Sequence, residues 1–189
     1  MSSNANTDSM DLGNATGRAR FAELLTASNR SAEIPEAADA YGWFVGSWDL
    51  DVCRYGKIDT AALGIRGEVH ASWVLEGRAV QDVWICRPNQ SGNLNLETAT
   101  YGTTLRIWDP SIQAWRITWR DPVANESRDQ IGRRCGCDVV QIGMRADGAP
   151  IRWSFTEITS NSFRWLGESL QPDGRDWVVE AEFRAHRVR

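Results

Sequence analysis

The stretch Tyr41-Gly-Trp-Phe-Val-Gly46-Ser-Trp48-Asp-Leu-Asp-Val52 divides the chain into two parts with different patterns. Before it, apolar residues have helical spacing. From Trp48 onward, apolar and polar residues alternate, which is typical of antiparallel strands with one buried face. No stretch between the expected strands is long enough for a crossover helix, which excludes parallel βαβ units. The sequence therefore predicts an all-β fold, a single closed antiparallel up-and-down β-barrel of about eight to ten strands.

The alternation predicts ten strands, over residues 47–55, 63–76, 78–87, 98–108, 114–121, 127–135, 137–145, 150–159, 162–170 and 176–187. Within them, every second residue is apolar and is expected to face the barrel interior. These residues are Trp48, Leu50 and Val52; Val69, Ala71, Trp73 and Leu75; Trp115, Ile117 and Trp119; Ile151, Trp153 and Phe155; Phe163 and Trp165; and Trp177, Val179, Ala181 and Phe183.

The N-terminal region, residues 1–40, is expected to form a flexible tail and a helical arm, and residues 41–189 form the barrel domain. Residues 1–13 are polar and should be loose. Phe21, Leu24 and Leu25 have the spacing of a short amphipathic helix over 16–27, either a lid over the barrel mouth or a packed arm. Pro35 predicts the start of a second short helix that ends near Val45 and plugs the closed end.

Composition excludes several classes of protein. The 189 residues fit one domain, and a net charge of −4 argues against nucleic-acid or membrane-surface binding. The N-terminus has no pattern of a signal peptide, so the expected location is the cytoplasm, where the four cysteines would be reduced. Cys135-Gly-Cys137 lacks a second ligand pair, and neither a metal nor a cofactor is expected.

Ten tryptophans are far more than a chain of this length usually contains. Aromatic side chains on the inner face can line a pocket for an organic ligand, and they can equally fill a packed core. If a cavity exists, the expected ligand-binding residues are those whose alternation points inward: Trp73, Trp84, Tyr101, Trp119, Trp153, Phe155 and Trp165.

Two carboxylates interrupt apolar faces and are the candidate catalytic residues. Asp82 alternates with Val80 and Trp84, and Glu157 alternates with Trp153 and Phe155. A buried carboxylate is either paired or has a raised pKa, and a pKa near neutrality suits a general acid or base. The alternative is structural: an internal ion pair with Arg54, or a position at the barrel rim.

Several motifs resemble an uncharacterised bacterial family of lipocalin-like proteins in the calycin group. They are Gly46-Ser-Trp-Asp49, Trp73-Val-Leu-Glu-Gly-Arg-Ala-Val-Gln-Asp82, Leu105-Arg-Ile-Trp-Asp-Pro110, Ala114-Trp-Arg-Ile-Thr-Trp119, Ile151-Arg-Trp-Ser-Phe-Thr-Glu157 and Ser162-Phe-Arg-Trp165. The resemblance covers about residues 41–189 and implies a barrel that begins at a Gly-x-Trp motif. It assigns no catalytic residue.

These observations leave three functions open. The first is binding of a hydrophobic or aromatic small molecule inside the barrel. The second is a cofactor-free cyclase or isomerase, for example one that closes a ring of a polyketide-like natural product with Asp82 and Glu157. The third is a weaker resemblance to the haem-binding nitrobindins, for which His186 is the available ligand, although Leu50 and Val52 stand where that group has glycines. A homodimer is also open.

Overall fold

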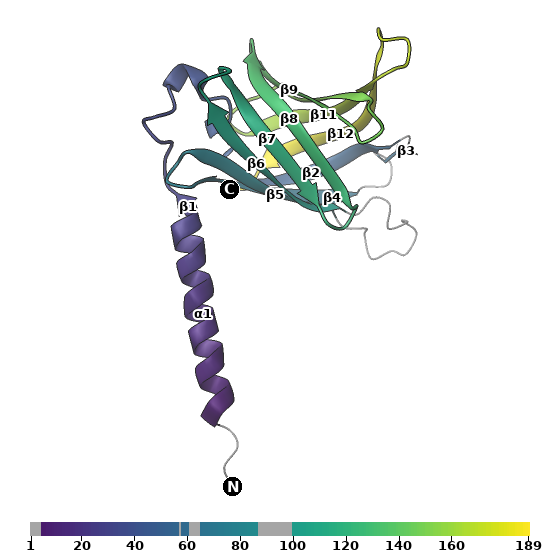
Figure 1. Cartoon of the computed structure of the whole chain (residues 1–189). Helices are drawn as coiled ribbons and strands as arrows, with labels where there is room; N and C mark the ends of the chain where they lie inside the picture. Colours follow the sequence, from purple (N-terminus) through teal and green to yellow (C-terminus); the bar gives the residue numbers. More distant parts are fainter. Residues whose placement is uncertain (1–4, 57, 61–64, 87–99) are drawn as a thin grey trace.

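The computed structural model describes residues 5–56, 58–60, 65–86 and 100–189, with the backbone alone for 5–14, 58 and 59. Among these residues, ten strands form a closed antiparallel barrel (Figure 1). They are β2 (Gly46–Tyr55), β4 (Arg66–Val74), β5 (Ala79–Cys86), β6 (Thr100–Asp109), β7 (Ala114–Asp121), β8 (Glu126–Cys135), β9 (Asp138–Met144), β10 (Pro150–Thr156), β11 (Ser162–Leu170) and β12 (Trp177–Arg187). Two-residue strands β1 (Thr26–Ala27) and β3 (Ile58–Asp59) add to this sheet.

Each strand pairs with its neighbour in sequence, and the barrel closes where β2 pairs with both β12 and β4. The predicted fold class is therefore confirmed. The observed strands lie within a few residues of the predicted ones, and the spans 114–121 and 162–170 agree at both ends. The predicted boundaries at residues 63, 87 and 98 lie outside the described residues.

Most residues predicted to face the barrel interior do so, but Leu75 and Trp177 do not. Leu75 is 46% exposed because it lies in the turn after β4, with a positive φ of 53°. Trp177 lies with its ring centroid 4.5 Å from the guanidinium carbon of Arg152, which is on the opposite face of β10 from Trp153. In the pairing of β11 with β12, a register shift between Gly167 and Glu168 falls between Ala181 and Val179 on β12, so Trp177 is out of phase with the inward Ala181 and Phe183.

One end of the barrel is plugged by the segment before β2. The predicted second helix is wrong, since the segment forms only two single turns of 3₁₀ helix, η1 (Glu36–Ala38) and η2 (Gly42–Phe44). The Asp39 carboxylate accepts the backbone N–H groups of Tyr41 and Gly42, which ends the first turn. Tyr41 and Phe44 are completely buried. The segment therefore plugs the closed end, as predicted, without being one helix.

The Gly-x-Trp motif at the start of β2 fits against the last strand. The Arg187 guanidinium lies 4.0 Å from the Trp48 ring centroid and donates to the carbonyls of Trp43, Val45 and Ser160 at 2.7–2.9 Å. Gly46 has a φ of 130°, and a Cβ there would collide with Arg187. Arg187 thus ties the plug, the first barrel strand and the last barrel strand together.

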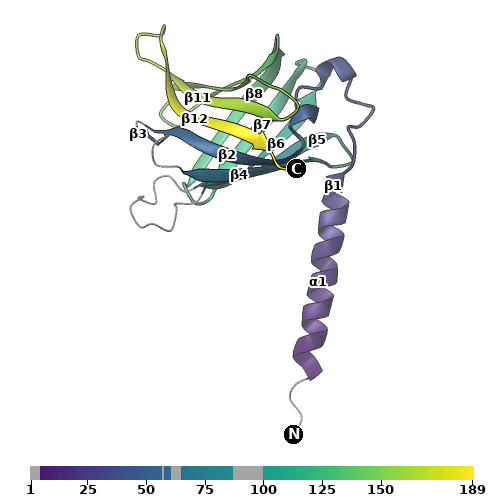
Figure 2. The ribbon, with the colours of Figure 1, turned by 180° about the vertical axis from the view of Figure 1, so that it is seen from behind.

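The N-terminal helix α1 (Ala5–Leu25) projects away from the barrel wall (Figures 1 and 2). It is longer than predicted, and residues 5–13, expected to be loose, are helical. Phe21 and Leu24 are 67% and 62% exposed, so the expected apolar stripe is not packed on the barrel. Strand β1 joins α1 to the end of β4 through Thr26 and Val74, at the plugged end. Within the described residues, no helix has both the length and the apolarity needed to cross a bilayer.

We predict that Arg187→Ala lowers the free energy of unfolding by about 2–4 kcal/mol, because three charge-assisted hydrogen bonds and the contact with Trp48 are lost together. Urea unfolding followed by tryptophan fluorescence measures the change. Arg184→Ala is the matched control, since this arginine is on the same strand with a half-exposed side chain, and it should cost less than about 1 kcal/mol. Equal losses in the two variants would contradict the role given to Arg187.

Candidate functional site

A cavity of about 560 Å³ opens at the end of the barrel opposite the plug. Most of its lining comes from the strand ends that point away from the plug: the last residues of β2, β5 and β7 and the first residues of β6, β8, β10 and β12. Trp165 and Gly167 of β11 and Arg145, which follows β9, also line it. The volume lies within the usual range for small-molecule sites. Because α1 is attached at the plugged end, it does not cover this mouth.

The inner part of the cavity wall is aromatic. Trp84, Trp119, Trp153, Trp165 and Phe183 line it, and their rings form a continuous set of contacts. Trp165 lies 5.8 Å from Trp84, 5.4 Å from Trp153 and 5.2 Å from Phe183, measured between ring centroids. Trp119 fits its indole over Gly102, where any Cβ would collide with it. These walls offer flat apolar surface to a ligand.

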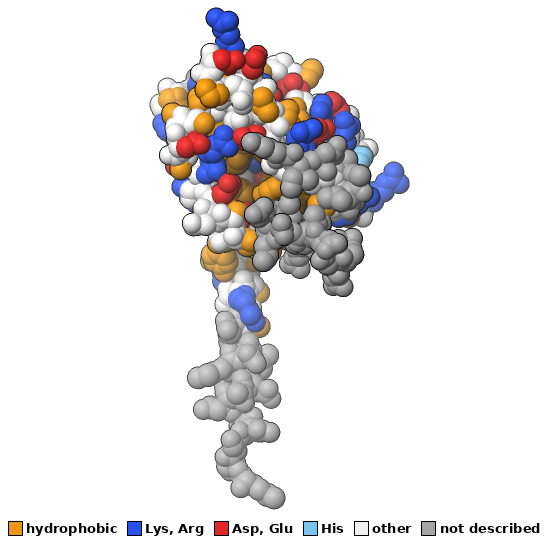
Figure 3. Space-filling model, turned by 90° about the vertical axis from the view of Figure 1, so that its right-hand side faces the viewer, with side chains coloured by type: hydrophobic (Ala, Val, Ile, Leu, Met, Phe, Trp, Pro, Cys, Tyr) orange, Lys and Arg blue, Asp and Glu red, His pale blue; other side chains and the backbone are white. Residues whose placement is uncertain are grey.

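The outer part of the cavity wall is charged. The charged residues of the lining are Arg54, Arg128, Arg145, Asp121, Glu126 and Glu180. Arg128 binds Glu126 at 2.9 Å, and Arg145 contacts both oxygens of Glu180 at 3.1 and 3.0 Å. Figure 3 shows a face of the molecule on which basic and acidic side chains are interspersed. The mouth therefore combines apolar depth with a polar rim.

Two weakly acidic groups of the wall stay protonated at neutral pH. Burial, with a smaller contribution from the negative charge of Asp121, raises the pKa of the Cys86 thiol to about 12. Burial also raises the pKa of Tyr55, although a hydrogen bond with Thr100 opposes the shift. The Tyr55 and Thr100 hydroxyls lie 3.3 Å apart. Neither group is poised as a nucleophile or a base.

A buried ion pair lies beneath the cavity, in the layer of side chains between the wall residue Trp84 and the plug; we call this layer the floor. The Asp82 carboxylate binds the Arg106 guanidinium and accepts the Thr104 backbone N–H at 3.0 Å; both charged side chains are almost completely buried. Gln141 accepts from Arg106 at 3.4 Å and from the Tyr41 hydroxyl at 3.1 Å. Neither Asp82 nor Arg106 lines the cavity.

Aromatic rings of the plug and of β10 enclose the other side of Arg106. Its guanidinium carbon lies 5.0, 5.4 and 5.8 Å from the ring centroids of Tyr41, Phe44 and Phe155. Burial also raises the pKa of Tyr41, so its hydroxyl remains a donor. The floor thus separates a filled half of the barrel from the hollow half.

The structure brings four of the seven predicted ligand-binding residues to the cavity: Trp84, Trp119, Trp153 and Trp165. Trp73 and Phe155 face inward as expected but belong to the filled half, where Trp73 contacts Trp115 and Phe155 contacts Phe44. They are 5% and 0% exposed and do not line the cavity.

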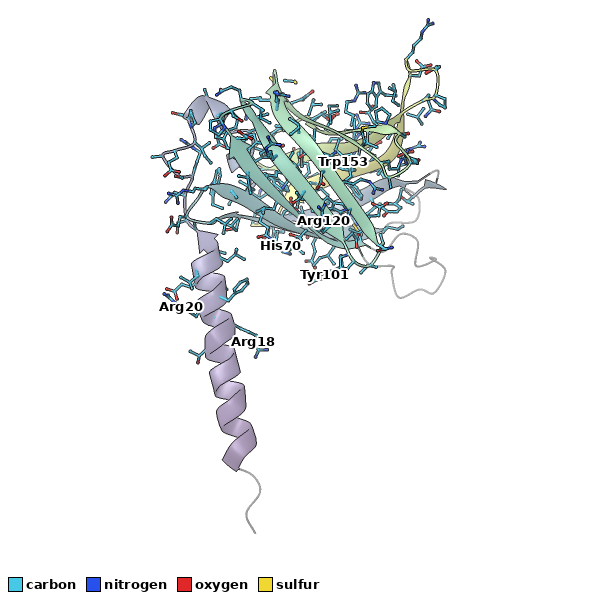
Figure 4. The ribbon with its side chains drawn as sticks, viewed as in Figure 1. Arg18, Arg20, His70, Tyr101, Arg120 and Trp153 are labelled. Atoms are coloured by element: carbon cyan, nitrogen blue, oxygen red, sulfur yellow. The ribbon has the colours of Figure 1, made fainter. Side chains whose placement is uncertain are left out.

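Tyr101 is on the outer wall, so its predicted inward position is wrong. It is 47% exposed and points away from the barrel (Figure 4). The inner face of β6 consists of Thr100, Gly102, Thr104 and Arg106, and Ile107, which is in phase with Tyr101, is exposed on the outer face. The alternation on β6 is therefore opposite to the predicted one: its polar residues face inward, because the buried Asp82 requires polar partners there.

The two predicted catalytic carboxylates do not meet. Asp82 is buried as expected, but its partner is Arg106 rather than Arg54. Glu157 is exposed, since it follows β10 with a positive φ of 51° and pairs with Arg164 at 3.4 Å on the outside of the plugged end. Its inward position is therefore wrong, and the rim alternative is closer to the structure. A catalytic role for either carboxylate stays a prediction.

The histidines and the Cys-x-Cys pair lie outside the cavity. The His186 and His70 side chains are 66% and 48% exposed, so neither can reach a haem iron held inside the barrel. Cys135 and Cys137 are exposed on either side of a turn at the plugged end. Among the residues that the structure describes, no group of three or more His, Cys, Asp or Glu side chains could hold a metal ion.

Comparison with known proteins supports the fold and no closer relationship. No protein-family model matches the sequence, and no curated protein matches it significantly. Among solved structures, the chain is similar to the S-type phycobiliprotein lyase CPES from Guillardia theta. The TM-score is 0.50 with 9% sequence identity, over 79% of this chain and 90% of that one. The chain is thus a lipocalin-like barrel with a buried cluster of aromatic residues.

We predict that Asp82→Leu lowers the free energy of unfolding by about 3–5 kcal/mol, because the Arg106 charge is left buried without a partner. The double variant Asp82→Leu/Arg106→Met should lose less than either single variant, as measured by urea unfolding. Glu157→Gln, at an exposed ion pair, should change stability by less than about 1 kcal/mol. If Asp82→Leu unfolded like the unmodified protein, the floor would not depend on this ion pair.

We also predict the order of thiol alkylation by iodoacetamide at pH 8, read by peptide mass spectrometry. Cys135 and Cys137 are exposed and should react within minutes, whereas Cys86 should stay unmodified until the protein unfolds, because it is buried and its pKa is about 12. Labelling of Cys86 as fast as Cys135 would show that the cavity wall opens to the reagent in solution.

Proposed function

We propose that this protein binds an apolar, aromatic small organic molecule in the cavity at the open end of the barrel. The observation that carries the proposal is the cavity of about 560 Å³ walled by four tryptophans and Phe183. The other half of the barrel is filled by packed side chains. A chain that needed its tryptophans only for stability could have filled both halves.

The form of the cavity favours a flat ligand. Trp119 and Trp153 contact each other edge to face, with centroids 6.2 Å apart, and Trp153 contacts Trp165 in the same way. A conjugated ring system stacks well on such surfaces and loses little conformational entropy on binding. The similar solved structure is named a phycobiliprotein lyase, which supports testing chromophore-like molecules among the ligands.

A cofactor-free cyclase or isomerase is the less favoured alternative. Such an enzyme would take its acid or base from the cavity wall, where Asp82 and Glu157 are absent. The carboxylates on the wall are already engaged: Glu126 and Glu180 bind arginines, and one oxygen of Asp121 accepts the backbone N–H groups of Val123 and Ala124 at 2.8 and 3.1 Å. Binding without turnover needs none of them to be free.

We predict that N-phenyl-1-naphthylamine, a neutral aromatic probe, binds the protein with enhanced fluorescence and quenches its tryptophans. Trp153→Ala should weaken this binding at least about fivefold, because one ring of the wall is removed. Native mass spectrometry of the purified protein provides an independent search for a ligand that co-purifies.

Trp177→Ala is the matched control for this experiment. Trp177 does not line the cavity and packs on Arg152 instead, so its removal should leave probe affinity within about twofold. Absence of probe binding, or equal losses in the two variants, would overturn the proposed function. Circular dichroism and unfolding curves confirm that both variants are folded.

A further inference from the structure

Two hydroxyl groups meet inside the mouth of the cavity. Tyr55, the last residue of β2, and Thr100, the first residue of β6, both line the cavity, and their hydroxyl oxygens lie 3.3 Å apart. In the sheet, β4 and β5 lie between these two strands. A side-chain contact across two intervening strands of a closed barrel passes through its interior. Both hydroxyls are therefore on the inner face.

A β-bulge turns Tyr55 toward this position. The pairing of β2 with β12 shifts register between Glu182 and Phe183, where β2 holds one additional residue. Val52 before the shift and Tyr55 after it are therefore both inward, although an odd number of positions separates them. Without the bulge, alternation would place Arg54 inside instead of Tyr55. Bulges that redirect a side chain are common beside functional sites.

The hydroxyl pair has more donors than it uses. Both groups are protonated at neutral pH, since burial raises the pKa of Tyr55 and the Thr100 hydroxyl does not ionise. One O–H can donate to the other oxygen, and the second O–H then has no further partner among the residues that the structure describes. Thr100 is only 9% exposed. A ligand group that accepts a hydrogen bond would satisfy this donor.

The charges around the hydroxyl pair favour a neutral acceptor. Burial and, to a smaller extent, the negative charges of Glu126 and Asp121 on the same wall raise the pKa of Tyr55. The same charges disfavour an anionic ligand group beside Tyr55. The net charge of −4 acts in the same direction. A carbonyl oxygen accepts a hydrogen bond without a formal charge, so it fits where a carboxylate would be repelled.

We propose that the ligand is an aromatic ketone or a similar conjugated carbonyl compound, and that the hydroxyl pair of Tyr55 and Thr100 donates a hydrogen bond to its carbonyl oxygen. The proposal rests on the binding function proposed above and names the ligand class of the same site. Thr100 is paired with Cys86, and Trp84 lies two residues before Cys86 on the same face of β5. A carbonyl at the hydroxyl pair thus leaves the attached rings beside the tryptophans.

Two neutral naphthalene probes that differ by one ketone group test this inference. The first is 6-propionyl-2-dimethylaminonaphthalene, and the second, 2-dimethylaminonaphthalene, lacks the ketone. We expect Tyr55→Phe to weaken binding of the ketone probe about threefold to tenfold, the effect of one hydrogen bond, and to change binding of the second probe less than about twofold. The bound ketone probe should also emit at shorter wavelength in this variant, because a hydrogen bond to the carbonyl shifts its emission to longer wavelength.

Tyr101→Phe is the matched control, because it removes the same hydroxyl from a tyrosine that is next to Thr100 in sequence and lies on the outer wall, 47% exposed. It should leave the affinity for both probes unchanged. If Tyr55→Phe has no effect or weakens both probes equally, or if only the probe without the ketone binds, the role of Tyr55 is overturned and the binding function stands. If neither probe binds, nor N-phenyl-1-naphthylamine, the binding function itself fails, and this inference fails with it.

Discussion

The interior of this barrel is organised around one buried ion pair, between Asp82 on β5 and Arg106 on β6. Two charges that are withdrawn from water need hydrogen-bond partners, and here the Thr104 backbone N–H donates to Asp82 while Gln141 accepts from Arg106. Because this layer spans the inside of the barrel, side chains on its two sides face different surroundings. On one side the plug fills the space, and on the other side the cavity begins.

The filled half allows the other half to be hollow. Tyr41 and Phe44 of the plug pack against the floor on the side away from the cavity. Arg187 holds the plug to the first and last barrel strands, β2 and β12. Core packing of this kind provides most of the stability of a domain, and a cavity forgoes part of it. A plugged end with many aromatic contacts therefore offsets the absence of packing at the mouth, and the cavity wall need not be optimised for stability.

The sequence predicted the barrel because alternation depends only on which face of a strand is buried, a local property. The prediction of inward-facing residues failed where the buried residues are polar. Arg106 was not identified, since an arginine between Leu105 and Ile107 has the pattern of an outward residue. Tyr101 was misplaced for the same reason. Glu157 was misplaced because the strand ends at Thr156, and a single left-handed residue turns the side chain outward.

Alternation also cannot say where along the barrel an inward residue lies, and this decides which tryptophans meet a ligand. Trp73 and Trp84 have the same pattern on neighbouring strands, yet the first is core and the second is wall. The difference follows from the direction of the chain: β4 runs toward the plug and β5 runs away from it. Polar residues near strand ends that point away from the plug, such as Asp121 and Glu180, are therefore the ones that reach the cavity. Asp82 is at the middle of its strand and therefore belongs to the floor. This carboxylate had the sequence pattern of a catalytic group, but the barrel needs it for its own structure.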